Sequence, residues 1–295
     1  MALGSAPSPL GPLTRAALRA SLAESTFARY EREWRRFRAA VPTPNDFVGT
    51  LEYLASLSHG NARVARAAIA FFSNSELSHP LVSRVISGLW KTASHPVAHD
   101  LEHRHIVALR LHVCAWGVTE RLSNDRLLAR ALVCFRLATW ARSSDCARIP
   151  RSLIKEIHNG LCVTILDPKQ RRPSAPHAKI SFVRAGDSRL CPVRHVQEVI
   201  RRFPNSAQLF PMDTDEIMSR VDGVLKACSE TRLLTPHDLR HLGASSALSL
   251  GFNVDQVARH GCWASATTLL RFYAEGWPRR PDSVRPTHIS LSAFV

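Results

Sequence analysis

The chain lacks the patterns typical of disulfide-bonded, zinc-binding and membrane-spanning proteins. Its seven cysteines include no Cys-x-x-Cys pair and no paired metal-ligand spacing, and an odd number of them suits a reducing compartment. No apolar run approaches the roughly 20 residues that cross a bilayer, so we expect no membrane partner. No Walker motif and no acidic metal-binding motif occurs. We therefore expect neither a metal nor any other cofactor.

Tyrosine and lysine are also scarce, whereas arginine is abundant. Three tyrosines occur, of which only Tyr273 follows residue 100, and five lysines stand against thirty-four arginines. A GC-rich genome alone can enrich arginine. A net charge of +15, however, is typical of proteins whose partner carries a phosphate backbone. Because both halves of the chain are basic, we expect double-stranded DNA to be that partner.

Apolar periodicity predicts a helical domain at 21–93. A helix start signal at Ser25 precedes apolar side chains at helical spacing. Further helical stretches are expected near 45–58, 60–74 and 80–91. The polar, proline-containing run from Thr92 to Pro96 favours a linker after this domain. We expect residues 1–20 to form a flexible basic arm.

A second domain is predicted at 97–276, followed by a tail at 277–295 that is rich in proline and arginine. Its helices are expected near 100–117, 123–141, 192–203, 213–228, 236–250, 253–260 and 265–274. Between them, β-rich runs at 161–166 and 178–183 flank a long polar hairpin that carries Lys169. The predicted fold is therefore mainly α, with a small antiparallel β-sheet near 150–183.

Two arginines of the second domain are candidates for binding a reacting phosphate. A phosphorane transition state gains charge on its nonbridging oxygens, and the planar fork of arginine can donate to two of them. Arg142 and Arg240 are the candidates, and Asp145 lies one helical turn beyond Arg142, where it could orient that side chain. Each alone also fits an ordinary structural arginine.

The other candidate groups would move protons or attack phosphorus. His237 titrates near neutrality and could accept a proton, although Thr235-Pro-His-Asp also fits a helix start. Lys169 would protonate a departing 5′ oxygen. Trp263 could donate its one N–H to a phosphate, with core packing as an equal alternative. The phenol of Tyr273 would be the nucleophile.

Taken in order, these residues resemble the tyrosine recombinase, or phage integrase, family. Residues 139–145 are similar to the family's Thr-Gly-x-Arg-x-x-Glu/Asp pattern, with Trp140 in place of glycine. The run His237-x-x-Arg240-His241 matches its His-x-x-Arg box. Trp263 occupies its His-or-Trp position, for which His260 is an alternative. Tyr273 matches the family's nucleophile, and Lys169 falls in the hairpin where the family keeps its lysine.

The resemblance implies an architecture and a reaction. Residues 21–93 look like the family's core-binding domain, which closes with the catalytic domain round DNA as a C-shaped clamp. Cleavage would leave a 3′-phosphotyrosine, and a homo-oligomer, the tetrameric synapse, would pair two sites. The spacing of ten between Trp263 and Tyr273 and the run Leu190-Cys-Pro-Val look most like recombinases of DIRS-type retrotransposons and Cryptons. A nuclear location is expected for a eukaryotic element, and the nucleoid for a prokaryotic one.

Two other functions remain open at this point. A DNA-binding protein of recombinase ancestry could have lost cleavage, and a type IB topoisomerase would share the chemistry without pairing two sites. A covalent protein–DNA adduct separates the first of these from an active enzyme, and a two-site recombination assay separates the second.

Overall fold

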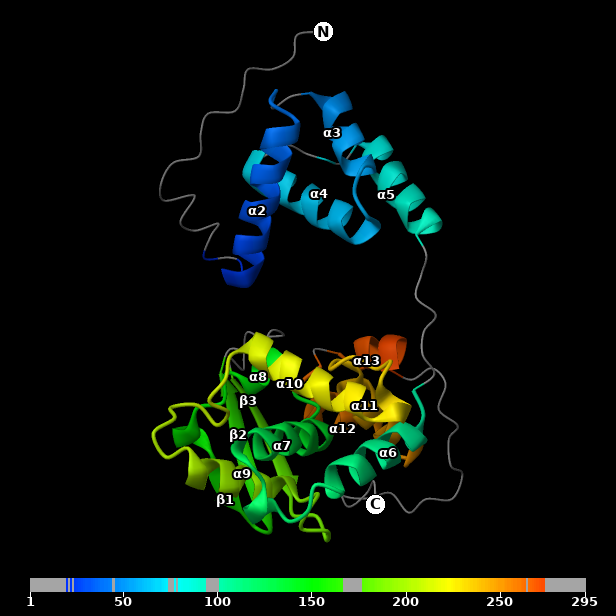
Figure 1. Ribbon diagram of the computed structural model, residues 1–295. Helices are drawn as coiled ribbons and strands as arrows, with labels where there is room; N and C mark the ends of the chain where they lie inside the picture. The colour runs from blue at the N-terminus through cyan, green and yellow to red at the C-terminus, as the bar shows by residue number, and fades with distance from the viewer. Residues whose placement is uncertain are drawn as a thin grey trace. The chain divides into compact units, whose positions relative to one another are not determined.

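The chain forms two compact units, Met1–Val97 and Ala98–Val295 (Figure 1). The computed structural model describes residues 20, 22, 24–43, 46–73, 77, 79–93, 101–166, 177–263 and 265–273. Most of the expected basic arm, the hairpin segment that contains Lys169, and the expected tail at 277–295 lie outside the described residues.

The described part of the first unit is helical. Its helices are α2 (Glu24–Ala40), α3 (Phe47–Ala55), α4 (His59–Ser73) and α5 (Pro80–Thr92). Residue Asp46 starts α3 by accepting a hydrogen bond from the Gly49 amide at 2.8 Å. The buried residues Phe37, Leu54 and Ile69 bring α2, α3 and α4 into one small core. Helix α2 begins at Glu24, so the expected start signal at Ser25 lies one residue inside the helix.

Helix α7 (Asn124–Thr139) is buried in the second unit. The other described helices of this unit are α6 (His103–Cys114), α8 (Ser143–Cys146), α9 (Pro192–Arg202), α10 (Thr214–Ala227), α11 (Asp238–Ser249), α12 (Val254–His260) and α13 (Ala266–Tyr273). Every residue of α7 from Leu127 to Thr139 is buried. Helices α9, α10 and α11 and the sheet pack against it (Figure 1), as expected for a helix that is largely apolar all round.

A three-stranded antiparallel sheet completes the second unit. The strands β1 (Lys155–Ile157), β2 (Gly160–Leu166) and β3 (His177–Val183) lie in the order β1-β2-β3, and Val163 pairs with Ile180. Alternate residues of β2 face the core, as in a sheet covered on one side. The predicted fold, mainly α with a small antiparallel sheet, is confirmed. None of the helices that the structure describes is long and apolar enough to cross a bilayer.

Candidate catalytic site

Arg142, in the short segment between α7 and α8, lies beside Asp145. Arg142 lies in extended backbone just before α8, with 16% of its side chain exposed. Its Nη1 lies 3.6 Å from Oδ2 of Asp145, and the same oxygen accepts a hydrogen bond from the Arg142 amide at 3.2 Å. Asp145 is therefore placed to hold both the backbone and the guanidinium of Arg142.

Arg240 is more deeply buried than Arg142. Only 1% of it is exposed, although α11 begins just two residues earlier. Its Nη1 donates to the carbonyl of Trp140, and its Nη2 donates to the carbonyl of Gly261 at 2.5 Å. One guanidinium thus joins three separate segments: the end of α7, α11 and the turn after α12.

The ring of Trp263 lies against the guanidinium of Arg240. The guanidinium carbon of Arg240 lies 3.8 Å from the centre of the Trp263 ring, within the range of a cation–π interaction. The ring is 1% exposed and reaches so close to Gly261 that a Cβ at that position would lie 1.7 Å from its Cζ3. The packing role considered for Trp263 is therefore present, and glycine at 261 is what makes room for it.

Trp140 stands where the resemblance expects glycine, and its backbone shows why glycine suits the position. Its φ is +52°, in the left-handed region that ends α7. The indole is fully buried, with its ring centre 4.5 Å from that of His260 and 6.1 Å from that of Trp263. Trp140 thus adopts a left-handed backbone that suits glycine, and its large buried ring lies beside His260 and Trp263.

His237 lies directly before α11 with its side chain exposed. Partial burial among neighbouring groups is the main cause that lowers its pKa, and the charges of Arg240, Arg136 and Arg142 lower it further against the opposing effect of Asp238. A lowered pKa favours the neutral imidazole, which is the form that can accept a proton.

The two supporting histidines have different surroundings. Nδ1 of His241 lies 3.5 Å from Ser245 Oγ on the next turn of α11. Nε2 of His260 lies 2.8 Å from the carbonyl of Ala138, and burial lowers the pKa of His260 to about 4. The neutral ring must therefore carry its proton on Nε2 to donate to that carbonyl. His260 ties α12 to the end of α7, which is a structural task for the alternative to Trp263.

Tyr273 is the last residue of α13. The structure describes its helical backbone, while its side chain lies outside the description, as does all of Lys169. Leu269 is fully buried and anchors α13, which packs on α11 and α12. By contrast, Leu270 is 44% exposed and contributes less to the docking of this helix.

The remaining two tyrosines are engaged in the first unit. The hydroxyl of Tyr53 donates to Glu33 at 2.7 Å, and burial together with that carboxylate raises the pKa of Tyr53. The ring of Tyr30 packs edge-on against Phe71, with 5.9 Å between their centres. Both side chains thus have packing roles in the first unit.

One residue near these groups was not predicted from the sequence. Arg136, on α7, is 1% exposed, and its guanidinium donates to the carbonyls of Ala141 and Pro236. An arginine inside an otherwise apolar helical run was the available signal, because such a charge needs buried partners.

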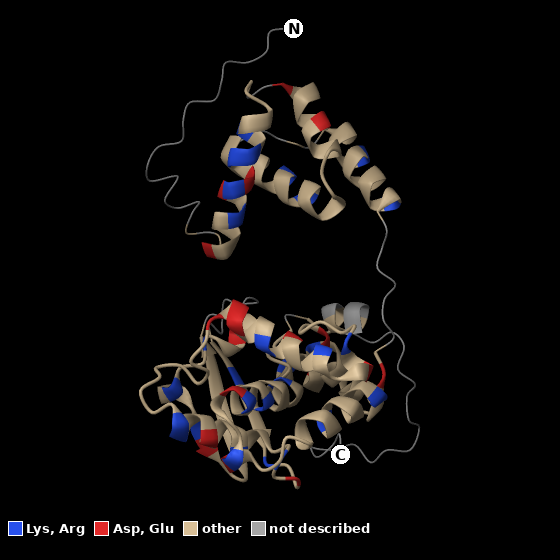
Figure 2. Cartoon of the chain, in the orientation of Figure 1, with Lys and Arg blue, Asp and Glu red and all other residues tan. Residues whose placement is uncertain are grey.

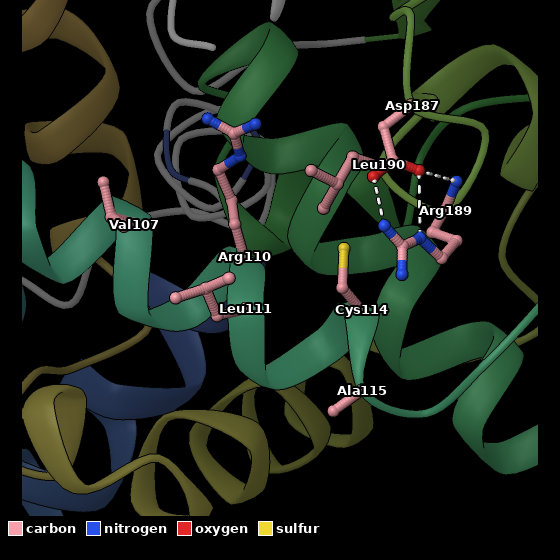
Figure 3. A pocket seen from close by; sticks show the side chains of 8 residues that line it. All are labelled: Val107, Arg110, Leu111, Cys114, Ala115, Asp187, Arg189 and Leu190. Carbon is pink, nitrogen blue, oxygen red and sulfur yellow. Dashed lines mark hydrogen bonds and ion pairs between the residues drawn. The ribbon is translucent and has the colours of Figure 1, made fainter.

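A pocket of about 400 Å³ lies elsewhere in the second unit (Figure 3). Its lining comes from α6 and the segment before α9, and consists of Val107, Arg110, Leu111, Cys114, Ala115, Asp187, Arg189 and Leu190. There Arg189 donates to Asp187 through Nε at 3.1 Å and Nη2 at 2.9 Å. None of the expected site residues lines this pocket, so it is separate from the candidate site. Within the described ranges no group of three or more His, Cys, Asp or Glu is placed to hold a metal ion.

Comparison with solved structures identifies the class of fold: it is that of the site-specific recombinases and integrases. The Tn1549 transposon integrase in complex with transposon right-end DNA matches with a TM-score of 0.63 and 14% identity, over 90% of this chain and 93% of that one. A lambda integrase dimer bound to a COC′ core site gives 0.59 and 13%, over 92% and 97%. The XerH recombinase in a post-cleavage complex gives 0.57 and 15%, over 85% and 76%. No protein-family model and no curated protein sequence matches the chain.

Proposed function

We propose that this protein cleaves and rejoins DNA strands through a covalent 3′-phosphotyrosine, with Tyr273 as nucleophile. The observation that carries the proposal is that Arg142 and Arg240 both lie near enough to His237 for their charges to lower its pKa. The charges of both arginines act on His237, and the backbone before Arg142 and the turn before Trp263 are both held by Arg240. Helix α13, which ends at Tyr273, packs on the same elements.

In the proposed reaction the Oη of Tyr273 attacks the phosphorus, so that an O–P bond forms and the P–O5′ bond breaks. His237 takes the phenolic proton, and Lys169 gives a proton to the departing 5′ oxygen. Arg142 and Arg240 stabilise the charge on the nonbridging oxygens. Attack by a 5′ hydroxyl on the phosphotyrosine reverses the step and joins a strand. Because the ester retains the free energy of the broken bond, neither ATP nor a metal is required.

The two expected arginines differ in how they could reach a phosphate. Arg142 is partly exposed and can do so directly. Both terminal nitrogens of Arg240 already donate to backbone carbonyls, so Arg240 would contact a phosphate through the second hydrogen of each nitrogen, or after a local rearrangement.

The remaining parts of the proposal concern partners and origin. We assign DNA binding to both units, residues 21–93 as a core-binding domain and residues 97–276 as the catalytic domain, with a tetramer pairing two sites. The spacing between Trp263 and Tyr273 supports an origin among DIRS-type or Crypton recombinases. A nuclear location follows for such an element in a eukaryote, and the nucleoid for a prokaryotic one.

A trapping experiment tests this function. The full chain is incubated with duplexes that carry a nick close to the cleaved bond. Cleavage then releases a short fragment that carries the free 5′ hydroxyl; this fragment diffuses away, so the adduct persists. Randomised duplexes stand in for the unidentified target. We expect a protein–DNA adduct that resists denaturation and forms equally well in excess EDTA. DNA binding without any adduct would support the silent, recombinase-derived alternative.

A further inference from the structure

Helix α7 contains two arginines that are similar in burial and in the number of carbonyls to which they donate. Arg130 is fully buried and Arg136 is 1% exposed, and each donates to two backbone carbonyls. Arg130 Nη2 donates at 2.6 Å to the carbonyl of Val113, in the last turn of α6, and Nη1 donates at 2.8 Å to the carbonyl of Gly117, just after that helix. Arg130 thus completes the carboxyl end of a scaffold helix, and its partners include no candidate site residue.

The partners of Arg136 are different, because each directly precedes a candidate site residue. Nε donates at 3.1 Å to the carbonyl of Ala141, the residue before Arg142. Nη2 donates at 2.6 Å to the carbonyl of Pro236, the residue before His237. One rigid guanidinium therefore spans the backbone segments that carry Arg142 and His237, which lie about a hundred residues apart in the sequence.

A second observation concerns the charged groups around Arg136. Its Nη1 is buried without a hydrogen-bond partner among the described residues, and so is Oδ1 of Asp145, the carboxylate that holds Arg142. Arg136 and Asp145 act on each other through their charges. The groups whose charges act on His237 are Arg240, Arg136 and Arg142, opposed by Asp238.

We propose that Arg136 is a positioning residue of the catalytic site: its guanidinium fixes the backbone segments that carry Arg142 and His237 relative to each other. Its charge also contributes to lowering the pKa of His237, after burial and the charge of Arg240. This inference rests on the proposed function for the catalytic consequence alone, because the geometry and the state of His237 can be measured without any reaction. If Arg136 had only a structural role, its replacement would have the same effects as the replacement of Arg130.

Three variants separate these roles. Arg136→Met keeps a buried apolar chain and loses both the charge and the bridge. Arg136→Lys keeps the charge, but a single ammonium cannot span two carbonyls as a planar fork does. Arg130→Met is the matched control, since it also removes a buried guanidinium from α7 and leaves two carbonyls without their donor.

The first readout is the titration of the His237 ring, followed by NMR on the full chain and assigned with a His237→Gln variant. We expect the midpoint to rise toward the ordinary pKa of histidine in Arg136→Met and to stay near the wild-type value in Arg136→Lys and Arg130→Met. An unchanged midpoint in Arg136→Met would overturn the electrostatic part. If that variant does not fold, Arg136→Lys carries the test through the second readout.

The second readout is the rate of adduct formation on nicked duplexes at pH 7, measured well below each variant's thermal midpoint. We expect both Arg136 variants to be slower by about 10-fold to 10²-fold, the scale of a small misplacement of reacting groups, and Arg130→Met to stay near wild type. Wild-type rates in Arg136→Lys, or equal losses in Arg130→Met, would overturn the positioning role. If wild-type protein forms no adduct while the His237 midpoint moves as expected, the proposed function fails and the electrostatic role of Arg136 stands.

Discussion

The indole of Trp140 fills the space beside Gly243. A Cβ built at residue 243 would lie 2.2 Å from both Cδ1 and Nε1 of the Trp140 ring, far inside any real contact. The two residues come from the end of α7 and the middle of α11, the helix that also carries Arg240. The large ring at 140 is thus matched by the absence of a side chain at 243.

This pair predicts a coupling in stability. Gly243→Ala should cost about 1–3 kcal/mol through overpacking, and Trp140→Gly about 3–5 kcal/mol through the lost ring, partly offset by relief of the left-handed backbone. In the double variant the new methyl group enters vacated space, so the loss should be smaller than the sum by about 0.5–3 kcal/mol. Urea unfolding of the four proteins measures this difference. Strictly additive losses would show that the two residues do not share the space.

The sequence predicted the fold well because its signals are local. The helix starts near residues 80 and 192 and the β-rich run at 161–166 follow from residue chemistry within a few positions, and the structure has helices from Pro80 and Pro192 and strand β2 at Gly160–Leu166. Strand β1 was missed because it is three residues long and wholly exposed, so it has no apolar pattern to detect.

The site was harder to predict, because its contacts join residues about a hundred positions apart. The residues Arg142, His237 and Arg240 could be chosen from spacing and chemistry. The sequence offers no means of knowing that Arg240 is buried against two carbonyls, or that Arg136 holds the residue before His237. Such links depend on how α7 and α11 pack, which no short motif encodes.

Arg142 and Arg240 should differ when each is replaced by alanine. Arg142→Ala should slow adduct formation by roughly 10²-fold or more with a modest loss of stability, because the side chain is partly exposed. Arg240→Ala should lower both the rate of adduct formation and the stability, because two buried carbonyls lose their donor at about 1–3 kcal/mol each. Lysine should rescue either poorly. Single-turnover rates and thermal midpoints give the comparison, and a wild-type rate in Arg240→Ala would remove that residue from the site.

Acid should destabilise the second unit through His195 as well as His260. Burial is the largest cause that lowers the pKa of the fully buried His195 to about 3, and the charges of Arg130 and Arg194 lower it further. Above an unfolded pKa near 6.5, both states are neutral and His195 makes no pH-dependent contribution. Below it the unfolded chain binds the proton first, so stability falls as pH drops, by on the order of 3 kcal/mol at pH 4. Unfolding free energies between pH 7 and 4 should fall less steeply in His195→Leu, and an unchanged slope would contradict this.

Binding to DNA should weaken steeply with salt. Basic residues occur in both units (Figure 2). On α2 the residues Arg29, Arg32, Arg35, Arg36 and Arg38 are all exposed. We expect the logarithm of affinity to fall linearly with the logarithm of salt concentration, by about 0.9 per phosphate contact. Replacing Arg29 and Arg32 by Gln should reduce that slope by at most about 1.8. An affinity indifferent to salt in fluorescence-anisotropy titrations would refute phosphate-dominated binding.

The most direct measurement of the central claim is adduct formation by Tyr273→Phe on a nicked duplex, beside wild type and Tyr53→Phe. The phenylalanine ring preserves the end of α13 and removes only the nucleophilic oxygen, so DNA affinity should stay at the wild-type level while the covalent adduct disappears. Tyr53→Phe should still form it, and peptide mapping of the wild-type adduct should locate the DNA on Tyr273. Undiminished adduct in Tyr273→Phe, or mapping to a different residue, would contradict the proposed mechanism.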